Sequence, residues 1–241
     1  MNDLEYARLA RVEADHWYYA GKRRLVRALL ARARPIGRED LLLDCGAGTG
    51  RFAAEMQAHC RVLVLDDHEQ ALRLLRERFR PEQIFALAGD RVPLPEGALD
   101  VVTALDVLEH TPDDAAVVRE FHRLLKPGGV VAVTVPAIMA LWSDWDVALH
   151  HHRRYTRPQL RALFPEAHWE VDYVNYTNVP VLPVVWLIRR YRRLLRLPDG
   201  LDDRPLPRWL NGLLRAQFVG LALARVPMPF GVSLVLLARR R

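Results

Sequence analysis

A short stretch around residue 45 constrains the fold more than any other part of the chain. The apolar run 41–43 leads directly into Asp44 and then into a loop with glycine at positions 46, 48 and 50. This pattern predicts a buried parallel strand, a tight turn and a helix that begins near Thr49. Alternate glycines let the backbone approach a ligand where a Cβ atom would clash, although they could also serve only to turn the chain. The stretch therefore predicts a site for a nucleoside-type cofactor at the end of the first strand.

Acidic residues follow the next strand-like runs in order. They are Asp66 and Asp67 after 61–65, Asp90 after 84–87, and Asp106 at the end of 99–106. A carboxylate at the tip of the second strand, about twenty residues past the first, is well placed to accept ribose hydroxyls. Asp66 and Asp67 are rivals for that role, and we expect one of them to face solvent. Asp90 could accept a hydrogen bond from an exocyclic amine of adenine.

The ordered set resembles the class I S-adenosylmethionine-dependent methyltransferases. The motifs that carry this resemblance are D44-C-G-A-G-T-G50, D66-D67, G89-D90, L99-D-V-V-T-A-L-D-V-L-E-H110 and L125-K-P-G-G129, and they span about residues 40–136. The loop has G-x-G-x-G rather than the G-x-G-x-x-G of nicotinamide or flavin sites, which favours a methyl donor over a hydride carrier.

The resemblance implies S-adenosylmethionine as cofactor and S-adenosylhomocysteine as product. It places the methionine and nucleoside portions on the first loop, the ribose at the tip of the second strand and adenine near the third. The implied cofactor-binding residues are Asp44, Gly46, Ala47, Gly48, Gly50, Asp66, Asp67, Asp90, Arg91, Leu105 and Asp106.

The alternation of strand-like and helical segments predicts an α/β fold of the Rossmann-like, three-layer type, in one domain. We expect a seven-stranded, mostly parallel sheet whose last strand is antiparallel. The predicted parts are a helical N-terminal cap over 1–38, a core over 39–178, an apolar and basic helical insertion over 179–230, and a last strand with a tail over 231–241.

The cysteines and the charge distribution indicate the cellular environment of the protein. Cys45 and Cys60 are the only cysteines, and Cys45 lies in the predicted cofactor loop, so a reduced, cytoplasmic protein is the simple interpretation. The N-terminus lacks the pattern of a secretion signal. Residues 1–150 hold 19 basic and 23 acidic side chains, whereas 151–241 hold 16 and 6. The positive charge is therefore concentrated in the C-terminal part.

Glu109 and His110 follow the fourth strand, where the resemblance places the methyl acceptor. His110 is the first candidate for a general base because its ordinary pKa lies near neutrality. It could instead cap a helix near Thr111. Glu109 could orient His110, bind an acceptor or be a solvated acid.

The segment after the fifth strand contains further candidate acceptor residues. Residues 136–149 form a predicted loop or lid, followed by an H-x-R-R-Y-[ST] pattern that ends at Thr156. The resemblance assigns acceptor contacts to this pattern and to the aromatic N-terminal cap. The implied substrate-binding residues are Tyr18, Trp142, His151, Arg154 and Tyr155. We expect no metal at His150–His152, because consecutive histidines rarely converge on one ion and no cysteine or carboxylate cluster accompanies them.

The insertion combines apolar residues with arginines. It suits helices over the acceptor pocket, a homodimer interface, peripheral contact of 179–196 with an anionic membrane, or ordinary packing in the core. The basic charge would also allow nucleic acid to bind, but no RNA- or DNA-binding module is present and we expect none. The sequence thus predicts metal-independent, in-line methyl transfer to an oxygen, or alternatively a nitrogen or carbon, of a small or lipid-like acceptor. The alternatives are an NAD-dependent oxidoreductase and a non-catalytic module that docks on a membrane or partner.

Overall fold

The computed structural model describes residues 3–87, 91–195 and 206–241 of the chain. The strands are β1 (Leu41–Cys45), β2 (Arg61–Asp66), β3 (Ile84–Ala86), β4 (Leu99–Leu105), β5 (Leu125–Pro136), β6 (Trp169–Thr177) and β7 (Ser233–Arg240). The helices are α1 (Asp3–Val12), α2 (Trp17–Ala33), α3 (Arg51–Met56), α4 (Glu69–Arg76), α5 (Asp114–Leu124), α6 (Asp144–Ala148), α7 (Arg157–Ala162), α8 (Leu182–Leu195) and α9 (Arg208–Leu223). Short 3-10 turns are η1 (Pro81–Gln83), η2 (Leu108–His110) and η3 (Met139–Leu141).

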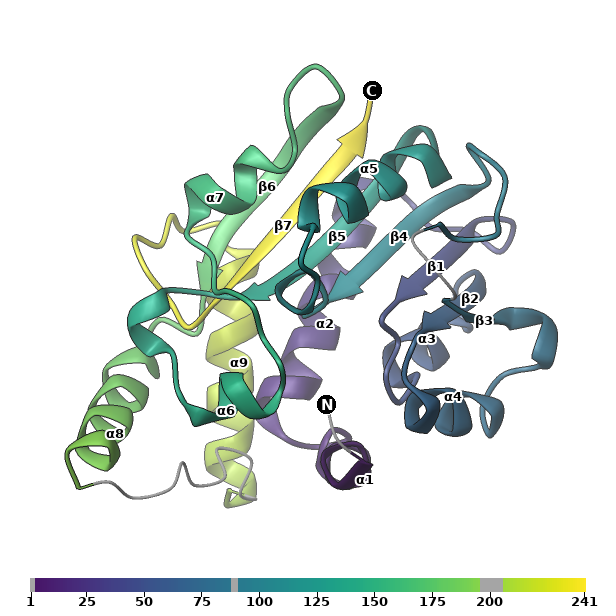
Figure 1. Cartoon of the computed structure of the whole chain (residues 1–241). Coiled ribbons are helices and arrows are strands. Elements are labelled where there is room, and N and C mark those ends of the chain that lie inside the picture. The colour runs from purple at the N-terminus through teal and green to yellow at the C-terminus, as the bar shows by residue number, and fades with distance from the viewer. Residues whose placement is uncertain (1–2, 88–90, 196–205) are drawn as a thin grey trace.

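The strands form one seven-stranded sheet in the order β3-β2-β1-β4-β5-β7-β6 (Figure 1). Strands β1 to β5 pair in parallel, while β7 lies antiparallel between β5 and β6. The predicted Rossmann-like fold with an antiparallel last strand is therefore confirmed. The order reverses direction beside β1, so the loops after β1 and β4 open at the same edge, where ligands of such sheets bind.

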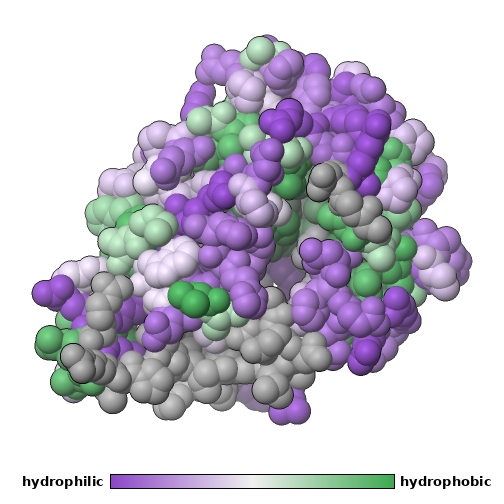
Figure 2. All heavy atoms as spheres, viewed as in Figure 1, coloured by the Kyte–Doolittle hydropathy of each residue, from purple (hydrophilic) through white to green (hydrophobic). Residues whose placement is uncertain are grey.

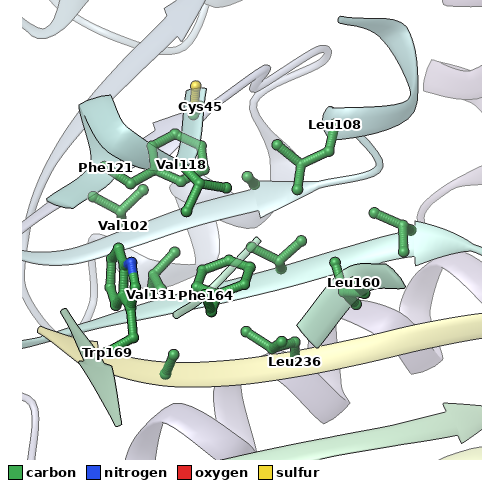
Figure 3. Packing of buried hydrophobic residues seen from close by; sticks show 14 of the residues in the cluster. Cys45, Val102, Leu108, Val118, Phe121, Val131, Leu160, Phe164, Trp169 and Leu236 are labelled. Carbon is green, nitrogen blue, oxygen red and sulfur yellow. The ribbon is translucent and has the colours of Figure 1, made fainter. Parts of the chain in front are cut away.

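Two apolar layers cover the sheet. On one face, α5 and α7 supply Val118, Phe121 and Leu160, which converge on strand residues such as Val131 (Figure 3). On the other face, α2, α3, α4 and α9 pack against alternate strand positions. Successive strand side chains point to opposite faces, so nearly continuous apolar strands can fill both layers.

The N-terminal helices are tied to the cofactor side of the core. The Thr49 hydroxyl donates to the Glu13 carboxylate at 2.7 Å, and both side chains are buried. Arg23 of α2 bonds the Glu13 carbonyl at 2.8 Å and the Glu55 carboxylate at 2.8 Å. The segment after α1 thus fixes the start of α3, next to the glycine loop.

The segment between β6 and β7 carries the predicted helical insertion. Helix α9 packs back on α2, so closely that a Cβ atom at Gly21 would lie 2.6 Å from Phe218. Helix α8 instead projects from the body of the molecule (Figure 1). Within 3–87, 91–195 and 206–241, no helix has both the length and the apolar character needed to cross a bilayer.

Candidate active site

The three glycines after β1 all have positive φ angles, of 65°, 58° and 74° for Gly46, Gly48 and Gly50. Two of them are required by the protein's own packing. A Cβ atom at Gly46 would lie 2.6 Å from Val107, and one at Gly50 would lie 2.6 Å from Phe79. At Gly48 the nearest atom, on the Tyr6 ring, is 4.0 Å away.

The loop itself is open to solvent. Gly46 is exposed, while Ala47 and Gly48 are partly exposed. The backbone of residues 46–48 therefore remains accessible to a ligand, which the predicted cofactor site requires.

Asp44 lies at the end of β1, with its carboxylate buried. Its Oδ1 accepts a 2.7 Å hydrogen bond from the hydroxyl of Thr103 on β4. Burial, together with the nearby charge of Asp66, raises the pKa of Asp44 to about 7. The carboxyl can therefore change protonation near neutral pH when a charged ligand approaches.

Asp66 and Asp67 differ sharply in their surroundings. Asp66 is buried and accepts hydrogen bonds from the amides of Gly48, at 2.8 Å, and His68, at 3.0 Å. Burial raises the pKa of Asp66. Asp67 is exposed. Each carboxylate oxygen of Asp66 keeps a second lone pair, so Asp66 is the better placed of the two to accept ribose hydroxyls.

The structure describes three of the four remaining predicted cofactor residues. Asp90 lies outside the described residues. Arg91 is exposed, and Leu105 is the partly buried last residue of β4. Asp106 follows in a left-handed conformation, with φ of 59°.

Asp106 is held from two elements. The Thr134 hydroxyl donates to Oδ1 at 2.8 Å, and the Lys22 ammonium pairs with Oδ2. Burial opposes the charged form of Asp106, but Lys22 outweighs it and lowers the pKa of the carboxyl. The Lys22 ammonium also lies 4.6 Å from the centre of the Tyr18 ring. Sequence reasoning missed Lys22, which is 84 residues away from its partner.

Glu109, His110 and His151 come together beside Asp106. Each offers one ligand atom, and these atoms all lie within 4.8 Å of one another. The Glu109 side chain is fully buried, and neither of its carboxylate oxygens has a hydrogen-bond partner among the described residues. Burial raises its pKa well above the ordinary value. Burial and the neighbouring His151 lower the pKa of His110 to about 4.

His151 is oriented from behind by Asp146, a residue that the sequence did not single out. The His151 Nδ1 atom lies 2.9 Å from Asp146 Oδ1, and Arg154 reaches the same carboxylate with two bonds of 2.7 and 2.8 Å. Asp146 has no exposed surface. Burial opposes its charge, but His151 and Arg154 hold the pKa of this carboxyl far below its usual range.

Two of the predicted acceptor residues already have internal partners. Arg154 is buried on Asp146, and the Tyr155 hydroxyl donates to Asp114 at 2.7 Å. Acceptor contacts by these two residues remain predictions. Trp142 is partly buried after η3, in the segment predicted to be a lid, which contains η3 and α6.

An apolar groove is lined in part by Phe218, which Tyr18 contacts. The Tyr18 ring stacks on Phe218 of α9 at a centroid distance of 6.2 Å. The groove is lined largely by apolar side chains from three parts of the chain, among them Trp17, Leu214, Phe218, Val179 and Met228. Because Tyr18 also contacts Lys22, the groove and the polar cluster adjoin the same aromatic side chain.

A cation and a nucleoside cofactor would use different parts of this site. Glu109 with two imidazoles is a ligand set that divalent transition metals accept. The exposed backbone of the loop, with buried Asp44 and Asp66, suits a nucleoside cofactor that carries hydroxyls and a positive charge.

Known proteins resemble this chain in sequence and in fold. A family model described as a methyltransferase domain matches residues 43–133. The chain is 32% identical over 161 residues to a probable S-adenosylmethionine-dependent methyltransferase of Mycolicibacterium smegmatis, covering 66% of this chain and 62% of that protein. It is 36% identical over 167 residues to a ubiquinone biosynthesis O-methyltransferase of Pseudomonas aeruginosa, covering 58% of this chain and 69% of that protein.

A solved structure from Thermotoga maritima, described as a possible histamine N-methyltransferase, superposes with a TM-score of 0.61 at 18% identity. That match covers 98% of this chain and 95% of the other, and it supports the fold. The chain spans less than two thirds of its Mycolicibacterium relative but more than two thirds of its Pseudomonas relative. The chain belongs to the class I S-adenosylmethionine-dependent methyltransferases, and S-adenosylmethionine is the cofactor that its glycine loop suits.

Proposed function

We propose that this protein transfers the methyl group of S-adenosylmethionine to a hydroxyl oxygen of a lipid-like acceptor. The observation that carries the proposal is the cluster of Glu109, His110 and His151 at the end of β4. It combines an imidazole kept neutral with one oriented by a carboxylate. Methylation of a hydroxyl requires a group that takes the proton, and neutral imidazole is suited to this task.

Asp44, Asp66 and the backbone of Gly46–Gly48 would hold the cofactor. When bound, S-adenosylmethionine supplies a methyl group on a positively charged sulfur. The protein must then hold an oxygen lone pair in line behind that methyl group, and positioning of this kind accounts for much of the rate in such transfers.

Either histidine of the cluster can take the proton. His151 has Asp146 on its Nδ1, which fixes the ring and stabilises the positive charge that forms when Nε2 accepts a proton. His110, with its lowered pKa, is available as a neutral base but is less able to retain a proton. His110, the candidate predicted from the sequence, and His151 are therefore both candidate bases, and the contact with Asp146 supports His151.

The apolar groove supports the lipid-like part of the proposal. The groove has a volume of only about 10 Å³, so Trp17, Leu214 and Phe218 would offer an aliphatic chain apolar contact at the surface. A polar head bearing the hydroxyl would then lie toward Tyr18 and Lys22. The P. aeruginosa relative is named a ubiquinone biosynthesis O-methyltransferase, which supports the oxygen part of the proposal.

The test uses the full chain and S-adenosylmethionine, with release of S-adenosylhomocysteine as the readout. Acceptors are matched hydroxyl compounds with and without a long aliphatic chain. We expect turnover only with the chain-bearing compounds, and mass spectrometry should locate the methyl group on oxygen. His151→Asn should lower kcat at least tenfold and leave cofactor affinity unchanged in calorimetry.

Three results would count against the proposal. Methyl transfer to nitrogen or carbon would remove the oxygen assignment. Equal turnover of short and long acceptors would remove the groove's role. Loss of turnover in EDTA, restored by a divalent cation, would assign Glu109, His110 and His151 to a metal instead of to proton transfer.

A further inference from the structure

Helix α8 has its amphipathic faces reversed relative to an ordinary surface helix. Apolar side chains recur at i, i+3, i+4, i+7, i+10 and i+11, which places them on one face. This outer stripe consists of Val184, Leu187, Ile188, Tyr191, Leu194 and Leu195, and their exposed fractions range from 40% to 79%. A helix on a soluble domain normally turns such a stripe inward.

Arginines occupy the inner side of the same helix. Arg189 is only 14% exposed, bonds the carbonyl of Leu141 and lies 4.0 Å from Asp146. Arg192 is partly buried. The helix is therefore anchored to the body through a cationic side chain, with its apolar stripe facing away. Figure 2 shows hydrophobic side chains at the end of the molecule where Figure 1 places α8.

Helix α9 also exposes apolar side chains. Trp209 is 72% exposed, and Leu213, one turn later, is exposed as well. The C-terminal end of α8 and the N-terminal end of α9 lie on the same side of the molecule (Figure 1). Arg190 and Arg208 are exposed beside these side chains, and the Arg190 guanidinium lies 5.8 Å from the centre of the Trp186 ring.

We propose that the stripe on α8, with Trp209 and Leu213, docks the protein on an anionic lipid bilayer. Residues 179–195 and 206–230 contain seven arginines, of which Arg190, Arg208 and Arg225 are exposed, and no acidic residue. This positive charge therefore favours an anionic membrane over a second copy of the chain as the binding partner. A second copy would place arginine against arginine, whereas anionic headgroups complement the basic side chains and the acyl region accepts the apolar ones. Tryptophan and tyrosine are side chains that favour the headgroup level.

Docking here would place the protein beside its acceptor. The stripe and the apolar groove lie on the same insertion, since Val179–Val181, just before α8, line the groove. A lipid-like acceptor could then enter without crossing water. This consequence depends on the proposed function, but docking itself does not, because it requires neither cofactor nor methyl transfer.

The experiment measures co-sedimentation of the full chain with vesicles. One set is phosphatidylcholine alone, and the other contains one quarter phosphatidylglycerol. We expect binding to the anionic set that weakens at high salt, since screening reduces attraction between charges at a surface. Arg190→Gln with Arg208→Gln should reduce affinity roughly 25-fold, at about fivefold for each arginine. Leu187→Glu with Leu194→Glu should reduce it at least tenfold.

Matched variants on another surface control for charge alone. Arg61→Gln with Arg80→Gln, and Ala58→Glu with His59→Glu, make the same charge changes at exposed positions outside the insertion. These controls should bind vesicles like the native chain. All variants should bind S-adenosylhomocysteine normally, which shows that they are folded.

Two outcomes would overturn the proposal. One is absence of binding to anionic vesicles, or binding that the α8 variants leave unchanged. The other is a dimer, seen by light scattering, that becomes a monomer in the Leu187→Glu, Leu194→Glu variant. In that outcome neither the dimer nor the monomer would bind vesicles. Failure of methyl transfer with intact vesicle binding would count against the proposed function and leave the docking surface standing.

Discussion

Replacement of Asp146 by asparagine should destabilise the protein more than any single loss of a surface charge. The carboxylate is fully buried and takes two hydrogen bonds from Arg154 and one contact from His151, all between 2.7 and 2.9 Å. Asparagine keeps the size but leaves the Arg154 guanidinium buried without a counter-charge. Breaking a buried pair in this way costs about 3 to 5 kcal/mol. For a chain of this size, the melting temperature should fall by roughly 6 to 20 °C.

The assay is urea and thermal unfolding of the native chain, Asp146→Asn, Arg154→Met and the double variant. The double variant should lose less free energy of unfolding than the two single variants lose together, since it removes both buried charges at once. The pKa of Asp146 is depressed in the folded state, so its stabilising effect is present above the ordinary aspartate pKa of about 3.9 and lost as pH falls further. A loss below about 1 kcal/mol at neutral pH, or strict additivity, would refute the reasoning.

Two further predictions concern the cofactor loop. Asp66→Ala should weaken binding of S-adenosylhomocysteine at least tenfold in calorimetry, because it removes both the predicted ribose acceptor and the bond to the Gly48 amide. Asp67→Ala, at the exposed neighbour, should bind nearly as the native chain does, and equal losses would contradict the assignment. Gly50→Ala should cost about 2 to 5 kcal/mol in urea unfolding, since it forces a positive φ and a clash with Phe79. A smaller loss would show that Phe79 moves aside.

The sheet and the cofactor loop were predictable because their signals are local. An apolar run leads into Asp44 and a glycine turn, and each of the next three strands in the chain has an apolar run before an acid. The distinction between Asp66 and Asp67 was not local, because it depends on which side chain faces the amide of Gly48.

The acceptor side was less predictable for the same physical reason. Asp146 and Asp144 stand two residues apart in sequence, and only the approach of Arg154 and His151 distinguishes them. Lys22 pairs with Asp106, which lies 84 residues further along the chain. The periodicity of α8 shows a stripe, but only its attachment through Arg189 shows that the stripe faces outward.

Charge around the two histidines leads to a final prediction. Three carboxylates lie there: Asp106 is paired with Lys22, and Asp146 with Arg154. Glu109 is buried without a hydrogen-bond partner among the described residues, and burial raises its pKa well above the ordinary value, which favours the protonated form. A cation that arrives beside it favours the charged form and lowers that pKa.

Binding of the positively charged cofactor should therefore release a proton from Glu109. Calorimetry in buffers of different ionisation enthalpy measures this directly, because the observed heat then varies with the buffer. S-adenosylhomocysteine lacks the sulfur charge and should release much less. Glu109→Gln should bind S-adenosylmethionine with no proton release from this position. Equal release with both ligands, or release that persists in the variant, would assign the proton to another group, and Asp44, with its pKa of about 7, is the nearest alternative at the loop.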